Sequence, residues 1–215
     1  MMTKSISAAL FAGAAMSAVL AAAPASATIH FAFTPGTPSP SAGYTVIDDF
    51  NTGTPGNLTG TFQIKTPPAD GYGAPPANSV PTGTPYLSVL GGDVANIGLG
   101  GVSTFEFDWG SIDTYNTLVI HSSAGDMTVI PGGNFPNLAN GNQALPGTNG
   151  LFIVTGDAGE SFTGITLSSS TNSFEIDNVA VSGGVPEPAA WSLMIVGFGM
   201  AGGLVRARRR TAVAA

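Results

Sequence analysis

Carboxylates are the side chains of this sequence with the greatest capacity for chemistry, and very few Lys or Arg residues accompany them. Residues 28–184 contain twelve Asp and Glu residues but only one Lys or Arg, Lys65, which leaves a net charge of −11. A surface of that charge repels phosphate backbones, so nucleic acid is not expected as a partner. Carboxylate and carbonyl oxygens are the ligands that hard divalent cations prefer, and calcium is therefore the ion that this composition favours.

Four acidic or amide residues have a placement that suits a structural calcium site. Asp48 and Asp49 end an early extended run, and Asp177 and Asn178 interrupt the last one. The apolar positions of residues 174–181 change parity across Asp177 and Asn178, and a β-bulge there would return them all to the core while redirecting a carboxylate. If the first and last strands are neighbours, the two acidic groups meet and share the ion. The alternative is that the acids are solvated strand-end residues, and no cofactor is then required.

A stretch in the middle of the chain combines aromatic rings with polar edges. Trp109, Asp113, Tyr115 and Asn116 fall within eight residues, Trp-Gly-Ser-Ile-Asp-Thr-Tyr-Asn. Stacking rings beside hydrogen-bonding groups suit a sugar, so these four residues are a candidate ligand surface. The same stretch also suits a structural turn, in which Asp113 and Asn116 bond backbone amides. Both interpretations remain open on the sequence.

Nucleophilic catalysis is poorly supported. The two histidines, His30 and His121, lie in no recognisable nucleophile motif, and neither G-x-S-x-G nor H-E-x-x-H occurs. Cysteine is absent, which excludes disulfides, thiolate metal sites, a thiol nucleophile and a lipoprotein anchor. A glycosidase needs only two carboxylates, but a single lysine leaves little to stabilise transition-state anions. We therefore expect no enzyme, with a secreted hydrolase as the least favoured alternative.

Short strands are the elements that must position these residues. Glycine and proline account for 30 and 16 of the 215 residues, and turn-forming clusters separate short apolar or alternating runs. This pattern predicts an all-β fold over residues 28–184, as a single β-sandwich of jelly-roll type. The predicted strands span residues 29–33, 44–50, 59–65, 86–90, 94–99, 102–109, 117–121, 127–130, 151–155, 161–167 and 173–181.

Alternation is clearest in residues 105–109, where three aromatic residues share one face and two acidic residues share the other. Residues 151–154 are apolar throughout, as expected of a strand covered on both faces. Two regions, 66–85 and 131–150, are dense in Pro, Gly and Asn. Such loops either form a binding rim or are tolerated insertions.

Residues 1–27 have the zones of a signal peptide. A lysine precedes an apolar run, and a proline then breaks the helix before Ala25-Ser26-Ala27. Small residues in that A-x-A pattern place signal-peptidase cleavage between Ala27 and Thr28. We therefore expect export through the secretion translocon.

The last apolar segment, residues 189–205, predicts a membrane anchor. Its 17 residues would form a helix about 25 Å long, which is a short transmembrane span. By the positive-inside rule the basic cluster that follows stays in the cytoplasm and stops transfer, so the preceding domain faces the periplasm from the inner membrane. The arginines of that cluster are Arg206, Arg208, Arg209 and Arg210.

A Pro-Glu-Pro tripeptide, a tryptophan, a glycine-rich span and terminal arginines occur together over residues 185–210. This combination resembles the PEP-CTERM sorting domain in its PEPxxWA variant, although Ser192 stands where that variant usually has alanine. The motif residues are Pro186, Glu187, Pro188 and Trp191. The resemblance implies recognition and cleavage near the tripeptide by an exosortase, in a protein that accompanies exopolysaccharide and biofilm formation.

Residues 86–181 resemble a subgroup of exosortase-dependent surface proteins, through the stretch 109–116 and the Ile-Asp-Asn-Val run at 176–179. Taken together, the sequence predicts an exported, non-catalytic cell-surface or extracellular-matrix protein. It would be anchored transiently in the inner membrane and then delivered to the cell surface, in association with exopolysaccharide. The alternative is a carbohydrate-binding module.

Overall fold

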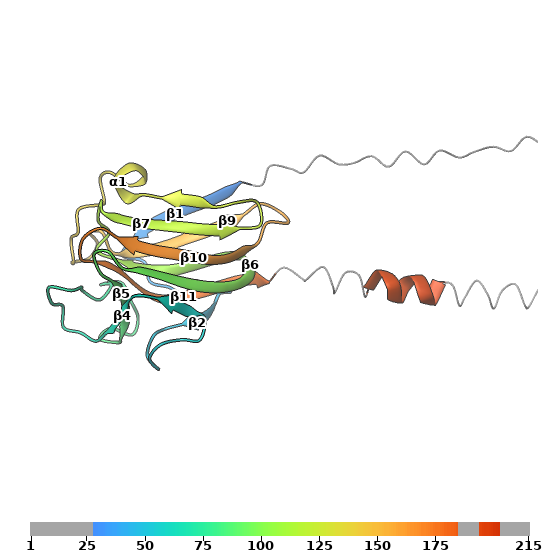
Figure 1. The fold of residues 1–215 in the computed structure, drawn as a ribbon, viewed down its shortest axis with the longest axis horizontal. Coiled ribbons are helices and arrows are strands. Elements are labelled where there is room, and N and C mark those ends of the chain that lie inside the picture. The colour runs from blue at the N-terminus through green and yellow to red at the C-terminus, as the bar shows by residue number, and fades with distance from the viewer. Residues whose placement is uncertain (1–27, 185–193, 203–215) are drawn as a thin grey trace, which may run out of the picture.

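The computed structural model describes residues 28–184 and 194–202 (Figure 1). Thr28, on the mature side of the predicted cleavage site, is the first described residue, and its N–H donates to Asp157 Oδ2 at 3.1 Å. The predicted residues that lie outside the described ranges are Ala25, Ala27, Pro186, Glu187, Pro188, Trp191, Arg206, Arg208, Arg209 and Arg210.

Residues 28–184 fold into eleven β-strands and one short helix, α1 (Pro131–Asn134), which the sequence pattern did not predict. The strands form one hydrogen-bonded sheet in which all paired strands run antiparallel, so the all-β prediction is confirmed. The strands are β1 (Ile29–Pro35), β2 (Thr45–Asp48), β3 (Leu58–Gly60), β4 (Gln63–Lys65), β5 (Tyr86–Val89), β6 (Val94–Gly110), β7 (Asn116–Ser122), β8 (Met127–Val129), β9 (Gly150–Gly156), β10 (Phe162–Ser169) and β11 (Phe174–Gly184).

The longest strand, β6, unites two runs that the sequence pattern separates. Gly100 and Gly101 have φ angles of +75° and +80°, which glycine adopts at little cost, so the chain changes direction there without ending the strand. The first half of β6 pairs with β3 and β10, and the second half pairs with β9 and β11. Because β6 belongs to both sets of neighbours, the sheet is continuous.

The register of β6 and β11 gives the domain two distinct ends. Glu175 pairs with Gly110 at one end, whereas Gly184 pairs with Val102 at the other. The start of β1 and the end of β11 both lie at this second end, and the loop-rich regions lie at the first (Figure 1). The termini of the domain therefore leave from one end, while the loop-rich regions occupy the opposite end.

A single aromatic cluster dominates the core. The predicted alternation in β6 is confirmed, because Phe105, Phe107 and Trp109 are fully buried in it. Trp109 stacks on Phe174 of β11 with ring centroids 4.5 Å apart, and Phe105 meets Phe162 of β10 edge to face at 5.3 Å. Contacts between rings from β6, β10 and β11 unite strands that belong to different halves of the sheet.

The predicted bulge in the last strand is also present. The register between β11 and β6 shifts between Asp177 and Ala180, and Asn178 has a φ of +49°. Ile176 and Val179 are both fully buried in the core, as the extra residue between them requires. The bulge leaves Asp177 paired with Asp108, on the face opposite the aromatic cluster.

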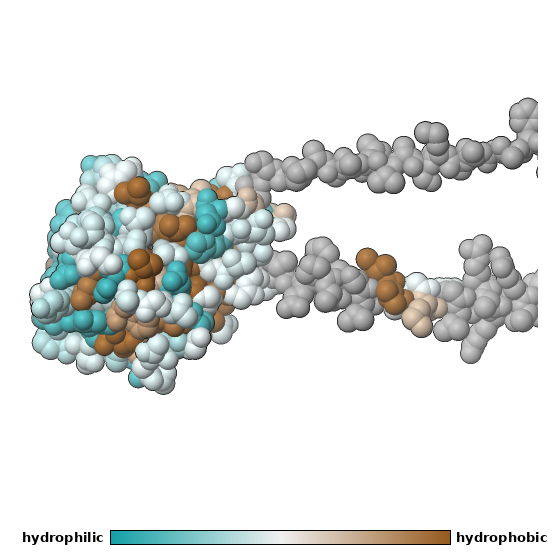
Figure 2. Space-filling model, in the orientation of Figure 1, coloured by the Kyte–Doolittle hydropathy of each residue, from teal (hydrophilic) through white to brown (hydrophobic). Residues whose placement is uncertain are grey.

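Residues 194–202 form a separate helical segment with exposed apolar side chains. Across the two described ranges, no helix combines the length and apolar character that a membrane span needs. Of the predicted span 189–205, residues 194–202 are described and helical, and residues 189–193 and 203–205 lie outside the described ranges. On the face of the domain in Figure 2, apolar residues form separate patches among polar ones.

Candidate functional site

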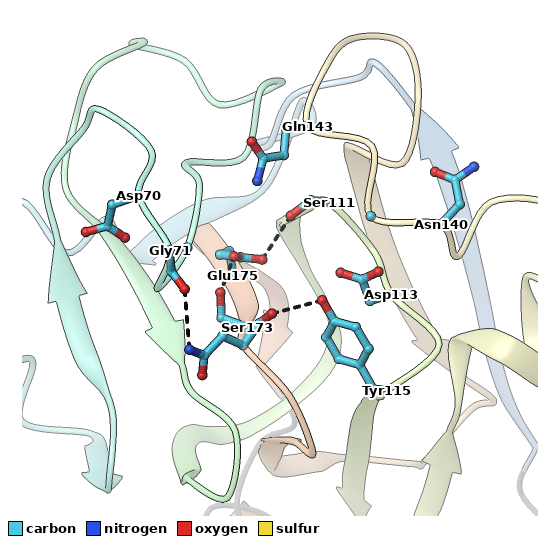
Figure 3. A pocket seen from close by; sticks show the side chains of 12 residues that line it. Asp70, Gly71, Ser111, Asp113, Tyr115, Asn140, Gln143, Ser173 and Glu175 are labelled. Atoms are coloured by element: carbon cyan, nitrogen blue, oxygen red, sulfur yellow. Dashed lines mark hydrogen bonds between the residues drawn. The ribbon is translucent and has the colours of Figure 1, made fainter.

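A polar pocket of about 350 Å³ opens at the loop end of the sheet (Figure 3). Its floor comes from the start of β11, and its walls come from the β6–β7 connection, the residues just before β11 and the two loop-rich regions, 66–85 and 131–150. The loop regions thus form a rim, one of the two roles open to them on the sequence. The side chains that define the pocket are Asp70, Ser111, Asp113, Tyr115, Ser173 and Glu175.

Glu175 forms the floor, and its carboxyl group is well supplied with donors. Ser111 Oγ donates to Oε2 at 3.0 Å, the Ala74 N–H donates to Oε1 at 3.2 Å, and the Ser173 hydroxyl also donates to Oε1. Burial nevertheless raises the pKa of Glu175 to about 7, because desolvation of the charged form outweighs these hydrogen bonds.

Asp113 and Tyr115 form one wall. The Tyr115 hydroxyl donates to the Asn172 carbonyl at 2.9 Å, which holds the ring at the pocket edge. The Asp113 carboxyl is partly exposed, and burial raises its pKa. Its backbone N–H donates to Asn116 Oδ1 at 2.9 Å, so Asn116 fixes the turn that presents Asp113.

Two glycines allow the loops to approach these carboxyl groups. At Gly73 a Cβ would lie 3.2 Å from Glu175 Oε1 and 2.8 Å from Ser88 Oγ. At Gly141 it would lie 2.5 Å from Asp113 Oδ1, and the φ of +68° also disfavours other residues. The width of the pocket thus depends on the absence of side chains at these positions.

The charge of the pocket is negative. Asp70, Asp113 and Glu175 all line it, and Lys65 Nζ contacts Asp70 Oδ2 at 2.7 Å. That ion pair, together with a backbone hydrogen bond from Tyr72, lowers the pKa of Asp70. A pocket with these groups accepts hydrogen bonds from hydroxyl or amine donors and repels anions.

The predicted ligand surface requires correction. Asp113 and Tyr115 do line the pocket, but Trp109 and Asn116 are both fully buried. Trp109 belongs to the aromatic core, and Asn116 Nδ2 donates inward to the Ser173 carbonyl at 3.0 Å. The exposed surface therefore excludes these two residues, and Asn116 has the structural role that the turn interpretation gives it.

Sequence reasoning missed Glu175 as a site residue. Glu175 alternates with Phe174 and Ile176 in an apolar strand, and nothing local separates it from a solvated strand residue. Its role depends on Ala74 and Ser111, which lie 101 and 64 residues away. Only the fold brings these residues together.

Three of the predicted calcium residues, Asp48, Asp177 and Asn178, are buried, but the predicted set does not come together as one group. Asp48 pairs with Val179 at a register shift between β2 and β11, whereas Asp177 pairs with Asp108 of β6. Burial, opposed by a hydrogen bond from Asn57, raises the pKa of Asp48 to about 6. Asp49 is partly exposed.

No three Asp, Glu or His side chains of the described ranges converge into a group that would hold a metal ion on their own. The two histidines lie apart: His30 contacts Asp157 at 3.3 Å, and His121 contacts Asp126 at 3.0 Å.

A scan of protein-family models and searches of curated proteins and of solved structures found no match to this chain.

Proposed function

We propose that this protein is an exported, non-catalytic cell-surface or matrix protein associated with exopolysaccharide, and that its domain is a jelly-roll-like β-sandwich. The observation that carries the proposal is the polar pocket at the end of the sheet opposite both termini of the domain. A domain held by its C-terminal tail in the inner membrane would present this pocket away from the attachment point.

The sorting part of the proposal depends on the sequence. An exosortase would cut near Pro186-Glu187-Pro188, after signal peptidase has cut before Thr28. The intact mass of protein recovered from the cell surface tests both cuts, and a species that begins at Thr28 and ends near residue 188 is expected. Surface protein that retains the arginines of residues 206–210 would contradict the second cut.

The pocket favours a second, more specific candidate, a carbohydrate-binding module. Hydroxyl, amide and carboxyl groups line the pocket together with Tyr115, and sugar hydroxyls and ring faces match this chemistry. Because the described residues that line the pocket include three carboxyl groups and no Lys or Arg, the ligand would be a neutral or amine-bearing glycan rather than a uronate or sulfated one.

Binding of defined polysaccharides to the mature protein tests this candidate. Saturable binding to neutral or amine-bearing glycans is expected, and Asp113→Asn should weaken it about tenfold without a change in melting temperature. Equal glycan binding by the wild type and the variant would show that this pocket is not the glycan-binding site. Release of reducing sugar would instead support a hydrolase, in which Glu175 and Asp113 supply the two carboxyl groups.

A further inference from the structure

A second group of acidic residues lies on the strand pair β6 and β11, on the face opposite the aromatic core. Glu106, Asp108 and Asp177 are at most 1% exposed. Asp177 and Asp108 are directly paired across the two strands, and Glu106 pairs with Ala180 beyond the bulge. We call these three residues, together with Ser39, Asn78 and Ser79 of the loops that cover them, the polar layer.

Two loops cover the acids and supply their donors. From the first loop, the Ser39 N–H donates to Asp108 Oδ1 at 2.7 Å, and the Ser41 N–H donates to Glu106 Oε1 at 2.5 Å. From the second, Asn78 Nδ2 donates to Asp108 Oδ1 at 2.5 Å. Asn178 Nδ2, at the bulge, donates to Asp108 Oδ2 at 2.9 Å. The layer is therefore a closed and specifically built environment.

The polar layer has no cation among its described neighbours. The ion pairs of the described chain, Lys65–Asp70, His30–Asp157 and His121–Asp126, all involve other carboxylates. Lys65 is the only Lys or Arg of residues 28–184. Burial of a carboxylate without a counter-charge is strongly unfavourable, so three such groups require neutralisation from another source.

Two oxygen atoms in the layer have no hydrogen-bond partner. They are Glu106 Oε2 and Asn78 Oδ1, and both residues are less than 5% exposed. Both atoms are acceptors. Buried acceptors without donors, beside carboxylates that have no counter-charge, are the environment that a hard metal cation satisfies.

We infer that the polar layer binds a divalent cation, with calcium as the ion of matching chemistry. Because the carboxylates alone do not converge, the ligand set is mixed, with Asp108 and Asp177 joined by the amide and hydroxyl oxygens of Asn78 and Ser79. Glu106 supplies a third negative charge beside them. Calcium accepts such irregular sets of six to eight oxygens, whereas magnesium requires a near-octahedral shell.

This site differs from the one predicted from the sequence. It retains Asp177 but replaces Asp48 with Asp108 and Glu106, which lie on the same face as Asp177. Asn178 is not a ligand in this set, and its Nδ2 donates a hydrogen bond to Asp108 instead. Asp49 lies close enough to Asp177 to raise its pKa, as a weaker contribution than burial and the charge of Asp108. The inference is independent of the proposed glycan pocket.

Thermal unfolding of the full chain in millimolar calcium and in chelator tests the inference. At a calcium concentration a hundredfold above Kd, the melting temperature should rise by about 5–10 °C, and magnesium should give a smaller rise. Calorimetric titration should show one calcium ion per chain. Equal melting temperatures in calcium and chelator would overturn the inference.

The Asp108→Asn variant localises the ion. It should lose the calcium-dependent rise, yet remain folded in chelator, because it removes one uncompensated buried charge. The matched control is Asp113→Asn in the pocket, which should keep the full rise. A rise that survives in Asp108→Asn would overturn the assignment to the polar layer. Loss of glycan binding in Asp113→Asn with an intact calcium response would separate the two sites.

Discussion

The pocket lies at the start of β11, just beyond the end of β6, whereas the polar layer lies within these two strands, and both are built around carboxyl groups. They differ in how closely loops cover the carboxyl groups and in which hydrogen-bond donors reach them. The floor of the pocket, Glu175, accepts hydrogen bonds from two hydroxyls and a backbone N–H, and the pocket beside it is open to solvent. In the polar layer the loop that carries Ser39 and Ser41 contacts Glu106, whose Oε2 atom has no partner, and the loop that carries Asn78 contacts Asp108.

This difference separates two uses of the same side-chain chemistry. An open, donor-rich acidic pocket exchanges water for a polar ligand from outside. A closed layer with unpartnered oxygens has to be neutralised from within, by a metal ion or by protons. The loop region 66–85 takes part in both, since Asp70 and Gly73 line the pocket while Asn78 and Ser79 cover the layer.

The largest contrast is expected for removal of one carboxyl group from each region. Asp108→Ala leaves the donors of Ser39, Asn78 and Asn178 without an acceptor in a buried place. The cost should be about 3–5 kcal/mol of unfolding free energy. Asp113→Ala, at a partly exposed wall, should cost less than about 1 kcal/mol. Chemical denaturation measures both, and similar losses would erase the distinction between the two regions.

A smaller effect is expected from pH, because burial raises the pKa values of Asp108 to about 6 and of Asp177 and Glu175 to about 7. These groups bind a proton more tightly in the folded state. Their contribution to stability is therefore complete below about pH 4 and is lost as the pH rises through about 6–7. Asp70, whose pKa is lowered at an exposed ion pair, acts weakly in the opposite direction.

In chelator, the free energy of unfolding should fall between pH 4 and pH 7 by an amount on the order of 2–4 kcal/mol. Denaturation curves at fixed ionic strength measure it. Asp177→Asn should flatten the profile, because it removes one of the titrating groups, and calcium should reduce the fall at the upper end. Stability that rises over this range would contradict the pKa directions.

The smallest effect is expected at the glycines of the pocket wall. Gly141→Ala combines a positive φ with a Cβ only 2.5 Å from Asp113 Oδ1, whereas Gly53→Ala has a φ of +95° and nothing within 4 Å. Gly53→Ala should cost about 1 kcal/mol from backbone strain alone. Gly141→Ala should cost more and also weaken glycan binding. Equal losses of unfolding free energy in the two variants would show that the pocket wall at Gly141 shifts easily to accept a side chain.

Much of the secondary structure follows from local patterns. The runs around Phe105 and around Ile153 alternate or stay apolar as strands require, and the parity change at Asp177 correctly indicates a bulge. The prediction of two strands in place of β6 was wrong for a local reason. Glycines usually end strands, and only the pairing of both halves with other strands keeps Gly100 and Gly101 within one.

The functional residues were predicted less well, because local chemistry does not reveal burial. Trp109 has the chemistry of a sugar platform, but its stacking on Phe174 places it in the core. Glu106 and Asp108 alternate with aromatic residues as solvated acids would, yet loops from elsewhere in the chain bury them. Asp113 and Tyr115 were predicted from the combination of an aromatic ring with polar groups, and both line the pocket.

The sequence by itself determined the strand-rich composition, the bulge and the strong excess of carboxylates, because each depends on neighbouring residues or on simple counts. The tertiary structure decided which carboxylates line a solvent-accessible pocket and which are buried beneath loops. That decision depends on register and loop cover: β11 places Glu175 beside Ser111 and Asp177 beside Asp108, and residues 39 and 78 fold over only the second pair. These contacts join residues 30 to 70 positions apart, and no local pattern encodes them.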